Sequence, residues 1–346
     1  MSSSGEAFAS YLKQSLPLIN EYVAAGTPGA PTSYDQAVDL ERYLYDPLKR
    51  FVSSGGKRIR PALCLLGAEA VGAAPAAAAS VAAAVELFQA AALIHDDIAD
   101  KSTTRRGVPC LHVSEGTGLA INAGDAALVA VSSHVINDAS LDLQTRMDLL
   151  GEILRMEDHT LEGQALDLGW ARDGRWDIAV GDYLEMARSK TAYYSAAVPL
   201  VLGAICGGGS TEQIEGLRAF GMQAGLAFQI QDDLLNLIGD KSAQGKDYRS
   251  DVTEGKRTLV MVWALEHLGR SDRDELVAIL SSGTSDPAQT GRAVELAQKA
   301  GAIDHARSYA AQLVDRAKRE LEHICIAKEA RTVLISMSDF FIERIS

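Results

Sequence analysis

The sequence predicts an all-α protein that forms one large helical domain over residues 1–346. Three observations predict it: Ala-rich stretches such as 73–84, few runs of alternating β-branched residues, and nine Pro placed mostly between periodic segments. A chain of 346 residues is long enough for two domains, but no Pro-, Gly- or Ser-rich linker divides it. We therefore expect a single domain.

Apolar residues at helical spacing, separated by turn residues, give the order of the helices. The segment 26–31 is rich in Gly and Pro and 281–286 is rich in Ser and Gly, so both are expected to be loops. Helices are expected over 36–53, 61–71, 77–100, 117–138, 143–169, 179–206, 211–239, 255–268, 272–281, 287–300 and 303–343.

Two of these helices carry acidic clusters. The first cluster is Asp96, Asp97 and Asp100, and the second is Asp232, Asp233 and Asn236. The outer members of each are four residues apart, so they face the same way on a helix and give a pair of oxygen ligands. Acidic helix residues usually form a solvated face, but the runs before both clusters are apolar nearly all round, which indicates burial. Buried neighbouring carboxylates need a cation, and oxygen ligands suit Mg²⁺ with a substrate phosphate.

Basic segments supply the counterpart for an anionic substrate. Lys57, Arg58 and Arg60 follow the pair Gly55-Gly56, and Arg105-Arg106 lies five residues beyond the first cluster. The formal net charge is −13, so these cations are local exceptions in an acidic chain. Nucleic-acid binding normally requires a basic surface, so a small anionic ligand is favoured and nucleic acid is not expected as a partner.

The ordered motifs together resemble the trans-type isoprenyl diphosphate synthases, over about residues 40–260. The resemblance implies an isoprenoid synthase type I fold, which is a helical bundle around a central cavity. The motifs that carry it are Gly55-Gly56-Lys57-Arg58-x-Arg60-Pro61, Gln89, Asp96-Asp97-x-x-Asp100, Arg105-Arg106-Gly107, Gly163-Gln164-x-x-Asp167, Lys190-Thr191 and Phe228-Gln229-x-x-Asp232-Asp233.

The resemblance also implies a role for each motif. Asp96 and Asp100, with Asp97, would hold two Mg²⁺ ions, and Asp232, with Asp233 and Asn236, would hold a third. Isopentenyl diphosphate would bind Lys57, Arg60, Gln89 and Arg106. The allylic diphosphate (dimethylallyl, geranyl or farnesyl) would contact Arg105, Gln164, Asp167, Lys190, Lys246 and Lys256, and the carbocation would lie beside Lys190, Thr191 and Gln229.

The expected activity is therefore magnesium-dependent, head-to-tail (1′-4) transfer of an allylic group to isopentenyl diphosphate, which makes a linear all-trans prenyl diphosphate. A class I terpene cyclase would not need Lys57, Arg60 and Arg106, and a non-catalytic partner subunit would lose metal ligands that are intact here. Helical di-iron proteins need Glu-x-x-His pairs, which Glu157 and His159 do not form.

Asn236 stands where many relatives have a third Asp, and its amide oxygen is a weaker Mg²⁺ ligand. Cys110 replaces a residue that is often Thr.

Product length is expected to depend on the helix that ends at Asp96. One helical turn, about 5.4 Å, is close to one isoprene unit. Ala91 and Ala92, one turn before Asp96, are too small to stop a chain at fifteen carbons, whereas Phe88 lies a further turn away. Geranylgeranyl diphosphate is the expected product, with longer polyprenyl or farnesyl diphosphate as alternatives.

Cellular context follows from composition. The four cysteines have no metal-ligand spacing and indicate a reducing compartment. The first residues do not form a signal peptide and no run approaches the length of a spanning helix, so a cytoplasmic protein that is not integral to the membrane is expected. Relatives are usually homodimers, which the resemblance implies here as well.

Overall fold

The computed structural model describes residues 4–33, 35–239 and 248–343. Within them the only strands form a short hairpin, in which β1 (Thr104–Arg105) pairs antiparallel with β2 (Val108–Pro109). All other secondary-structure elements of the described residues are helices, as predicted. The helices are α1 (Glu6–Gly26), α2 (Ala37–Leu40), the π-helix η1 (Glu41–Tyr45), α3 (Asp46–Ser53), α4 (Ile59–Ala70), the 3₁₀-helix η2 (Pro75–Ala78), α5 (Ala79–Ala99), α6 (Leu111–Ser114), α7 (Thr117–Ile136), α8 (Leu143–Arg172), α9 (Val180–Ala187), the π-helix η3 (Arg188–Ala197), α10 (Val198–Cys206), α11 (Thr211–Ile238), α13 (Ser250–Thr253), α14 (Leu259–His267), α15 (Arg270–Ser281), α16 (Pro287–Lys299), α17 (Ala302–Glu322) and α18 (Lys328–Glu343).

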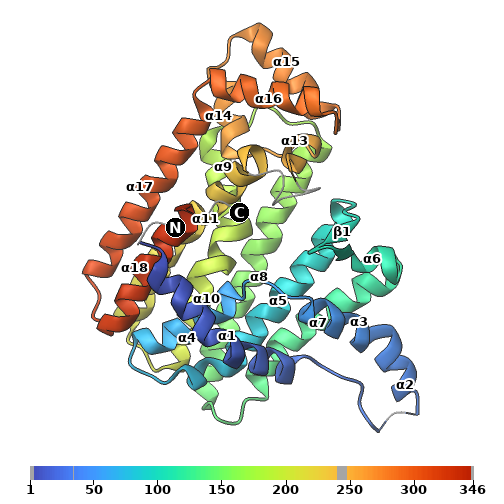
Figure 1. Cartoon of the computed structure of the whole chain (residues 1–346). Coiled ribbons are helices and arrows are strands. Elements are labelled where there is room, and N and C mark those ends of the chain that lie inside the picture. The colour runs from blue at the N-terminus through green and yellow to red at the C-terminus, as the bar shows by residue number, and fades with distance from the viewer. Residues whose placement is uncertain (1–3, 34, 240–247, 344–346) are drawn as a thin grey trace.

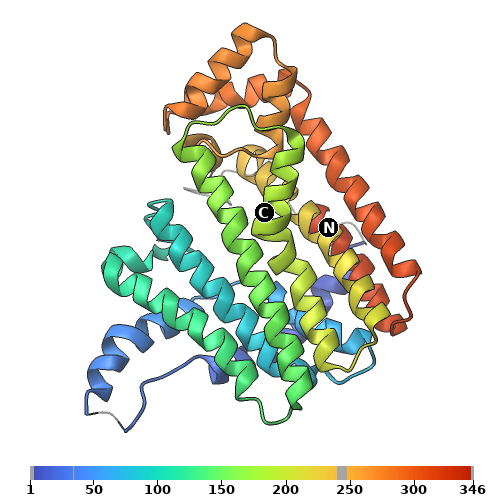
Figure 2. The ribbon, with the colours of Figure 1, turned by 180° about the vertical axis from the view of Figure 1, so that it is seen from behind.

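The long helices form a bundle around the two helices that carry the acidic clusters, α5 and α11. Figures 1 and 2 show α8 and α11 running through the middle of the molecule, with α5 and α7 toward one side, α17 and α18 toward the other, and α15 and α16 across one end. α5 packs against α7, and α11 packs against α17 and η3. Most of α5 is buried, which fits its nearly uniform Ala, Val and Leu composition.

Glycines allow α4 and α10 to cross at close range. A Cβ atom on Gly203 would lie 1.9 Å from the carbonyl oxygen of Cys64, and one on Gly67 would lie 2.2 Å from that of Leu200. Real Cβ atoms do not come so close, so the crossing requires glycine on both helices. Helix α10 is the direct continuation of η3, so this crossing also fixes the end of η3 relative to α4.

Several segments differ from the sequence-based expectation. Helix α1 was not predicted, nor were the hairpin and α6. The helix expected over 303–343 is two helices, because the residues between them are held by other parts of the fold: the Cys325 carbonyl accepts a hydrogen bond from Gln213 (2.6 Å) and the Ala327 amide donates to Ala70 (2.8 Å). Likewise, the helix expected over 255–268 begins only at Leu259.

The expectation that no run reaches the length of a membrane-spanning helix is wrong. Two helical stretches of the described residues, 75–99 and 117–136, are long and apolar enough by length and composition. In the first, 72 % of the most apolar window is buried in the bundle, as in the core helix of a globular protein, whereas the corresponding figure for the second is 39 %.

Candidate active site

A cavity of about 1180 Å³ lies between α5, α7, α8, α9, η3 and α11, and both acidic clusters face it. Asp96 and Asp100 from α5 line it, as do Asp232, Asp233 and Asn236 from α11. Because these residues end their helices' long apolar runs, the cavity has carboxylates at one end and hydrocarbon further along α5. The two motifs, more than 130 residues apart, thus meet as predicted.

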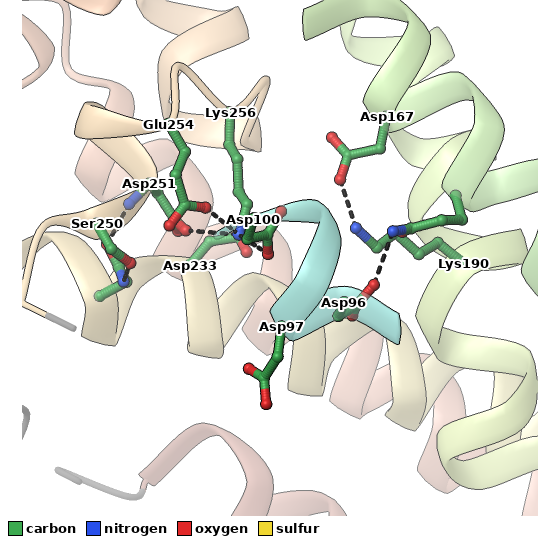
Figure 3. Close-up of polar contacts among 12 residues, drawn as sticks. Asp96, Asp97, Asp100, Asp167, Lys190, Asp233, Ser250, Asp251, Glu254 and Lys256 are labelled. Atoms are coloured by element: carbon green, nitrogen blue, oxygen red, sulfur yellow. Dashed lines mark hydrogen bonds and ion pairs between the residues drawn. The ribbon is translucent and has the colours of Figure 1, made fainter. Parts of the chain in front are cut away.

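Asp97 does not share the position of Asp96 and Asp100. Its side chain is 1 % exposed and points away from theirs, as Figure 3 shows. Nε of Arg105 donates to both carboxylate oxygens of Asp97, at 2.8 and 2.9 Å. Nη2 of Arg105 forms an ion pair with Oδ1 of Asp97 at 2.7 Å. Asp97 therefore orients the Arg105 guanidinium, which β1 carries along the wall of the cavity.

Asp96 is held by α8 and lies near a lysine of η3. Nε2 of Gln164 donates to Oδ1 of Asp96 (2.7 Å), and Lys190 forms an ion pair with Asp167 one turn further along α8. Burial raises the pKa of Asp96, and Lys190 opposes that rise. The carboxylate is therefore poorly solvated, and a bound cation would stabilise its charge.

Asp233 serves mainly to position its neighbours. It is 6 % exposed and accepts hydrogen bonds from the Tyr183 hydroxyl (2.7 Å) and from Nε2 of Gln229 (2.7 Å). Burial, followed by the charge of Asp251, raises its pKa. Since the Gln229 nitrogen is engaged here, its carbonyl oxygen is left for the cavity, which Gln229 lines.

Asn236 uses its amide to attach α13 to α11. Nδ2 donates to Oγ of Ser250 (2.9 Å), and Oδ1 accepts from the Asp251 amide (3.2 Å). The oxygen expected to reach a metal ion is thus engaged in a structural contact. The contact also brings the Asp251 carboxylate into the wall of the cavity.

Lys256 lies between the two acidic motifs. Its Nζ is 2.7 Å from Glu254, 3.5 Å from Asp251 and 3.9 Å from Asp100 (Figure 3). Burial opposes the charge, but the carboxylates, Asp251 first, raise the pKa of this lysine. Asp251 and Glu254 were not singled out from the sequence, where they are ordinary polar residues of a short segment. Lys246 lies outside the described residues.

The arginines and lysines of the basic segments, together with Gln89, divide into two groups. Arg60, Gln89 and Arg106 line the cavity. Arg60 donates to Oγ of Ser195 (2.6 Å), and its guanidinium lies 4.5 Å from the centre of the Tyr194 ring. Oε1 of Gln89 is buried without a hydrogen-bond partner among the described residues, so it is available to a ligand.

Two other basic residues do not face the cavity. Lys57 is exposed on the loop before α4 and is not among the cavity-lining residues. Arg58 is buried, forms an ion pair with Glu86 and donates to the Val52 carbonyl (2.6 Å). It has a left-handed backbone (φ 51°), and Arg106 donates to the Gly55 carbonyl, so two arginines hold this loop in place. The charge of Arg58 therefore supports the loop and not a ligand.

The apolar part of the cavity is lined by α5, α7, α8 and η3. Phe88 and Ala92 line it, together with Leu128, Leu161 and Tyr194. The Phe88 and Tyr194 rings meet edge to face, with centroids 5.5 Å apart. Ala91 is fully buried in the core and does not line the cavity. Cys110, between the hairpin and α6, is buried, and its amide donates to the Thr103 carbonyl (3.1 Å).

The donor atoms at the polar end fit Mg²⁺. Asp96, Asp100 and Asp232 line the cavity and carry carboxylate oxygens, which are the hard ligands that Mg²⁺ prefers. His95 and Met186 also line the cavity, but imidazole and thioether groups suit softer metal ions. No three His, Cys, Asp or Glu side chains of the described residues form a complete metal site by themselves. Magnesium does not need one, because it takes one or two carboxylates and completes its shell with water and substrate phosphates.

Residues 41–297 match the family described as polyprenyl synthetase. The chain belongs to the polyprenyl synthetase family. A short chain isoprenyl diphosphate synthase of Methanothermobacter thermautotrophicus is 41 % identical over 86 % of this chain and 89 % of that protein. A geranylfarnesyl diphosphate synthase of Natronomonas pharaonis is 32 % identical over 99 % of both chains.

Solved structures of related proteins superpose on this chain over nearly its whole length. Geranylgeranyl pyrophosphate synthetase from Pyrococcus horikoshii superposes with a TM-score of 0.87, at 32 % identity and 98 % coverage of both chains. A Corynebacterium glutamicum geranylgeranyl pyrophosphate synthase, complexed with isoprenyl diphosphate and magnesium, gives a TM-score of 0.81 at 28 % identity, covering 99 % of this chain and 97 % of that one. The protein is an isoprenyl diphosphate synthase, a trans-prenyltransferase with the isoprenoid synthase fold, as its motifs predicted.

Proposed function

We propose that the synthase joins isopentenyl diphosphate head to tail (1′-4) to an allylic diphosphate, and that its main product is geranylgeranyl diphosphate. The allylic partner is dimethylallyl, geranyl or farnesyl diphosphate. The observation that supports the product length is the Phe88–Tyr194 ring pair, which lines the apolar part of the cavity two helical turns from Asp96. Ala92, one turn from Asp96, leaves the first level open.

Asp96, Asp100 and Asp232 are the side chains that would hold magnesium, three ions per site, and Asp97 and Asp233 would act through their neighbours. Bound magnesium neutralises the negative charge that develops on the departing diphosphate. Arg105, held by Asp97, adds a guanidinium to the same oxygens. Lys190, Gln164, Asp167 and Lys256 complete this allylic end, with Lys246 outside the described residues.

Isopentenyl diphosphate occupies the other diphosphate pocket, made by Arg60, Gln89 and Arg106, with Lys57 on the adjoining loop. No bond to this diphosphate breaks, so charge and hydrogen bonds are sufficient there. The apolar walls exclude water from the allylic cation, and the oxygens of Thr191 and Gln229 stabilise its charge. The isopentenyl pocket distinguishes this proposal from a terpene cyclase.

Chromatography of the dephosphorylated products tests the chain length. The parent should yield mainly a twenty-carbon alcohol, Ala92→Phe should shorten it toward fifteen carbons, and Phe88→Ala should lengthen it. Ala91→Phe is the matched control: it enlarges a core position, so it should lower thermal stability and leave the product length unchanged. A twenty-five-carbon parent product, as in the Natronomonas relative's name, would contradict the proposal.

We further propose that the synthase is a cytoplasmic homodimer. Large apolar side chains are exposed along α7 and α8, including Val129 (70 %), Leu143 (70 %), Leu154 (54 %) and Leu161 (67 %). We call these residues the α7–α8 face. Val129 and Leu161 also line the cavity, so a second copy on this face would close its wall. The four free cysteines fit a reducing compartment, which cell fractionation would test.

A further inference from the structure

The π-helix η3 carries three cavity-lining residues that the proposed reaction uses: Lys190, Thr191 and Tyr194. A π-helix is wider than an α-helix and is rare beyond a single turn, and such segments are frequent at functional sites. Ten residues in this conformation therefore need support from the surrounding helices. The source of that support determines how the three side chains are placed.

Glycines of two neighbouring helices make room for the η3 backbone. A Cβ atom on Gly163 of α8 would lie 2.3 Å from the Lys190 nitrogen. On α11, a Cβ atom on Gly225 would lie 2.6 Å from the Ala192 carbonyl oxygen, and one on Gly221 would lie 2.5 Å from Cα of Ala197. The η3 backbone is thus in direct contact with the backbones of α8 and α11. A displacement of one part of η3 would therefore move the rest of it.

A buried polar cluster holds the face of η3 that points away from the cavity. The Tyr193 hydroxyl donates to Oε1 of Glu152 (2.9 Å), and Nη1 of Arg218 donates to the Tyr193 oxygen (3.2 Å). Arg218 also binds Glu152 through Nη2 (3.1 Å), and Arg155 binds it at 2.6 Å. Glu152 has no exposed surface, and its hydrogen bonds, chiefly with Arg218, outweigh burial and lower its pKa. The cluster joins α8, η3 and α11.

The next two residues of η3 connect this cluster to both ends of the cavity. Tyr194 forms the edge contact with Phe88, and Ser195 accepts the hydrogen bond from Arg60. Three successive residues therefore bind the cluster, the floor of the cavity and an arginine of the isopentenyl pocket. Lys190, one turn earlier, faces Asp167 and Asp96.

We propose that Glu152, Arg218 and Tyr193 are positioning residues that fix the rotation of η3, and thereby set both the rate of prenyl transfer and the length of the product. They do not touch the substrate. They act through Lys190, Thr191 and Tyr194, so the inference rests on the proposed function of those residues. Loss of the Tyr193 hydroxyl frees one side of η3, and Tyr194 then no longer meets Phe88 in a single orientation.

The test compares two tyrosines that each donate to a glutamate. Tyr193→Phe removes the hydrogen bonds to Glu152 and Arg218 but keeps the ring. Tyr11→Phe is the matched control, because the Tyr11 hydroxyl donates to Glu69 (2.5 Å) between α1 and α4, and neither residue lines the cavity. Thermal unfolding, kcat and the product distribution are measured for both full-length enzymes, below the unfolding temperature of each.

We expect Tyr193→Phe to lose about tenfold in kcat and to add products one isoprene unit longer than the parent's, since small misplacement of reacting groups is costly. Tyr11→Phe should keep parental kcat and products even if it is equally destabilised. Parental product lengths in Tyr193→Phe would overturn the proposal, as would an equal shift in Tyr11→Phe. A parent product other than twenty carbons would contradict the proposed function and leave this comparison intact.

Glutamate variants give a second measurement. Glu152→Gln keeps oxygen and nitrogen atoms for Tyr193 and the arginines, whereas Glu152→Ala leaves Arg218 without its buried partner and is expected to fold poorly. The Gln variant should therefore fold. Because it lacks the carboxylate charge that pairs with Arg218, it should also shift the products in the same direction as Tyr193→Phe. A folded Glu152→Gln enzyme with parental rate and product length would also overturn the proposal.

Discussion

At the scale of single residues, neighbouring acids in the two motifs have different surroundings. In the first motif, Asp96 and Asp100 line the cavity, whereas Asp97 binds Arg105. In the second, Asp232 and Asp233 both line the cavity, but Asp233 accepts hydrogen bonds from Tyr183 and Gln229. Helical spacing predicted that Asp96 and Asp100 share one face, because spacing relates residues on one helix. It did not predict Asp251 and Glu254, because the contacts that bring them in come from another helix.

The first prediction is that Asp96→Ala or Asp232→Ala abolishes turnover. Each carboxylate would help to hold an ion that stabilises the transition state by several kcal/mol, so a loss of about a thousandfold or more is expected. Circular dichroism should be unchanged, and Asp304→Ala, at an exposed surface position, serves as the control. Turnover within about tenfold of the parent would remove the metal assignment.

A second prediction separates the two adjacent arginines. Arg105→Ala should lower kcat, because its charge matters most as the diphosphate departs, whereas Arg106→Ala should chiefly raise the KM for isopentenyl diphosphate. Asp97→Asn should resemble Arg105→Ala, because it loses the carboxylate charge that orients that guanidinium. Steady-state kinetics with each substrate varied in turn would show whether the assignments are reversed.

At the scale of elements, apolar periodicity predicted the order of most helices. It did not predict where the helices end or which of their side chains face the cavity. Residues 323–327 contain neither Pro nor Gly, yet the chain turns there because its backbone groups bond to α4 and α11. In the same way, spacing alone did not determine whether Ala91 or Ala92 faces the substrate. That choice depends on where α7, α8 and η3 pack around α5, which is tertiary information.

The third prediction concerns the crossing of α4 and α10. Gly203→Ala should lower the free energy of unfolding by about 1–3 kcal/mol, because the new methyl group meets the Cys64 carbonyl and forces the helices apart. Gly118→Ala is the control: nothing lies within 4 Å of its Cβ position, so helix propensity should make it neutral or slightly stabilising. Equal denaturant midpoints for the two variants would contradict this account.

At the scale of the whole molecule, the composition of the surface carries information that the motifs do not. The chain is acidic overall, yet the α7–α8 face is apolar. The fourth prediction is that the synthase is a dimer in solution and that Leu154→Glu makes it monomeric, because a buried carboxylate in a symmetric interface appears twice. Light scattering would measure the mass. Leu16→Glu, an equally apolar but isolated exposed position on α1, should not change it.

The last prediction follows from the position of Lys256 among Asp100, Asp251 and Glu254. An ammonium group attached to the chain already balances part of the negative charge where the two acidic helices meet, and Lys190 and Arg105 do the same nearby. We therefore expect folding to be independent of the ions that catalysis requires. Treatment with a chelator should abolish turnover while leaving the melting temperature within a few degrees, and added magnesium should restore activity without refolding. Lys256→Met should lower the stability of the protein only when magnesium is absent. The melting temperature of this variant should therefore rise clearly when magnesium and diphosphate are added, whereas that of the parent should not.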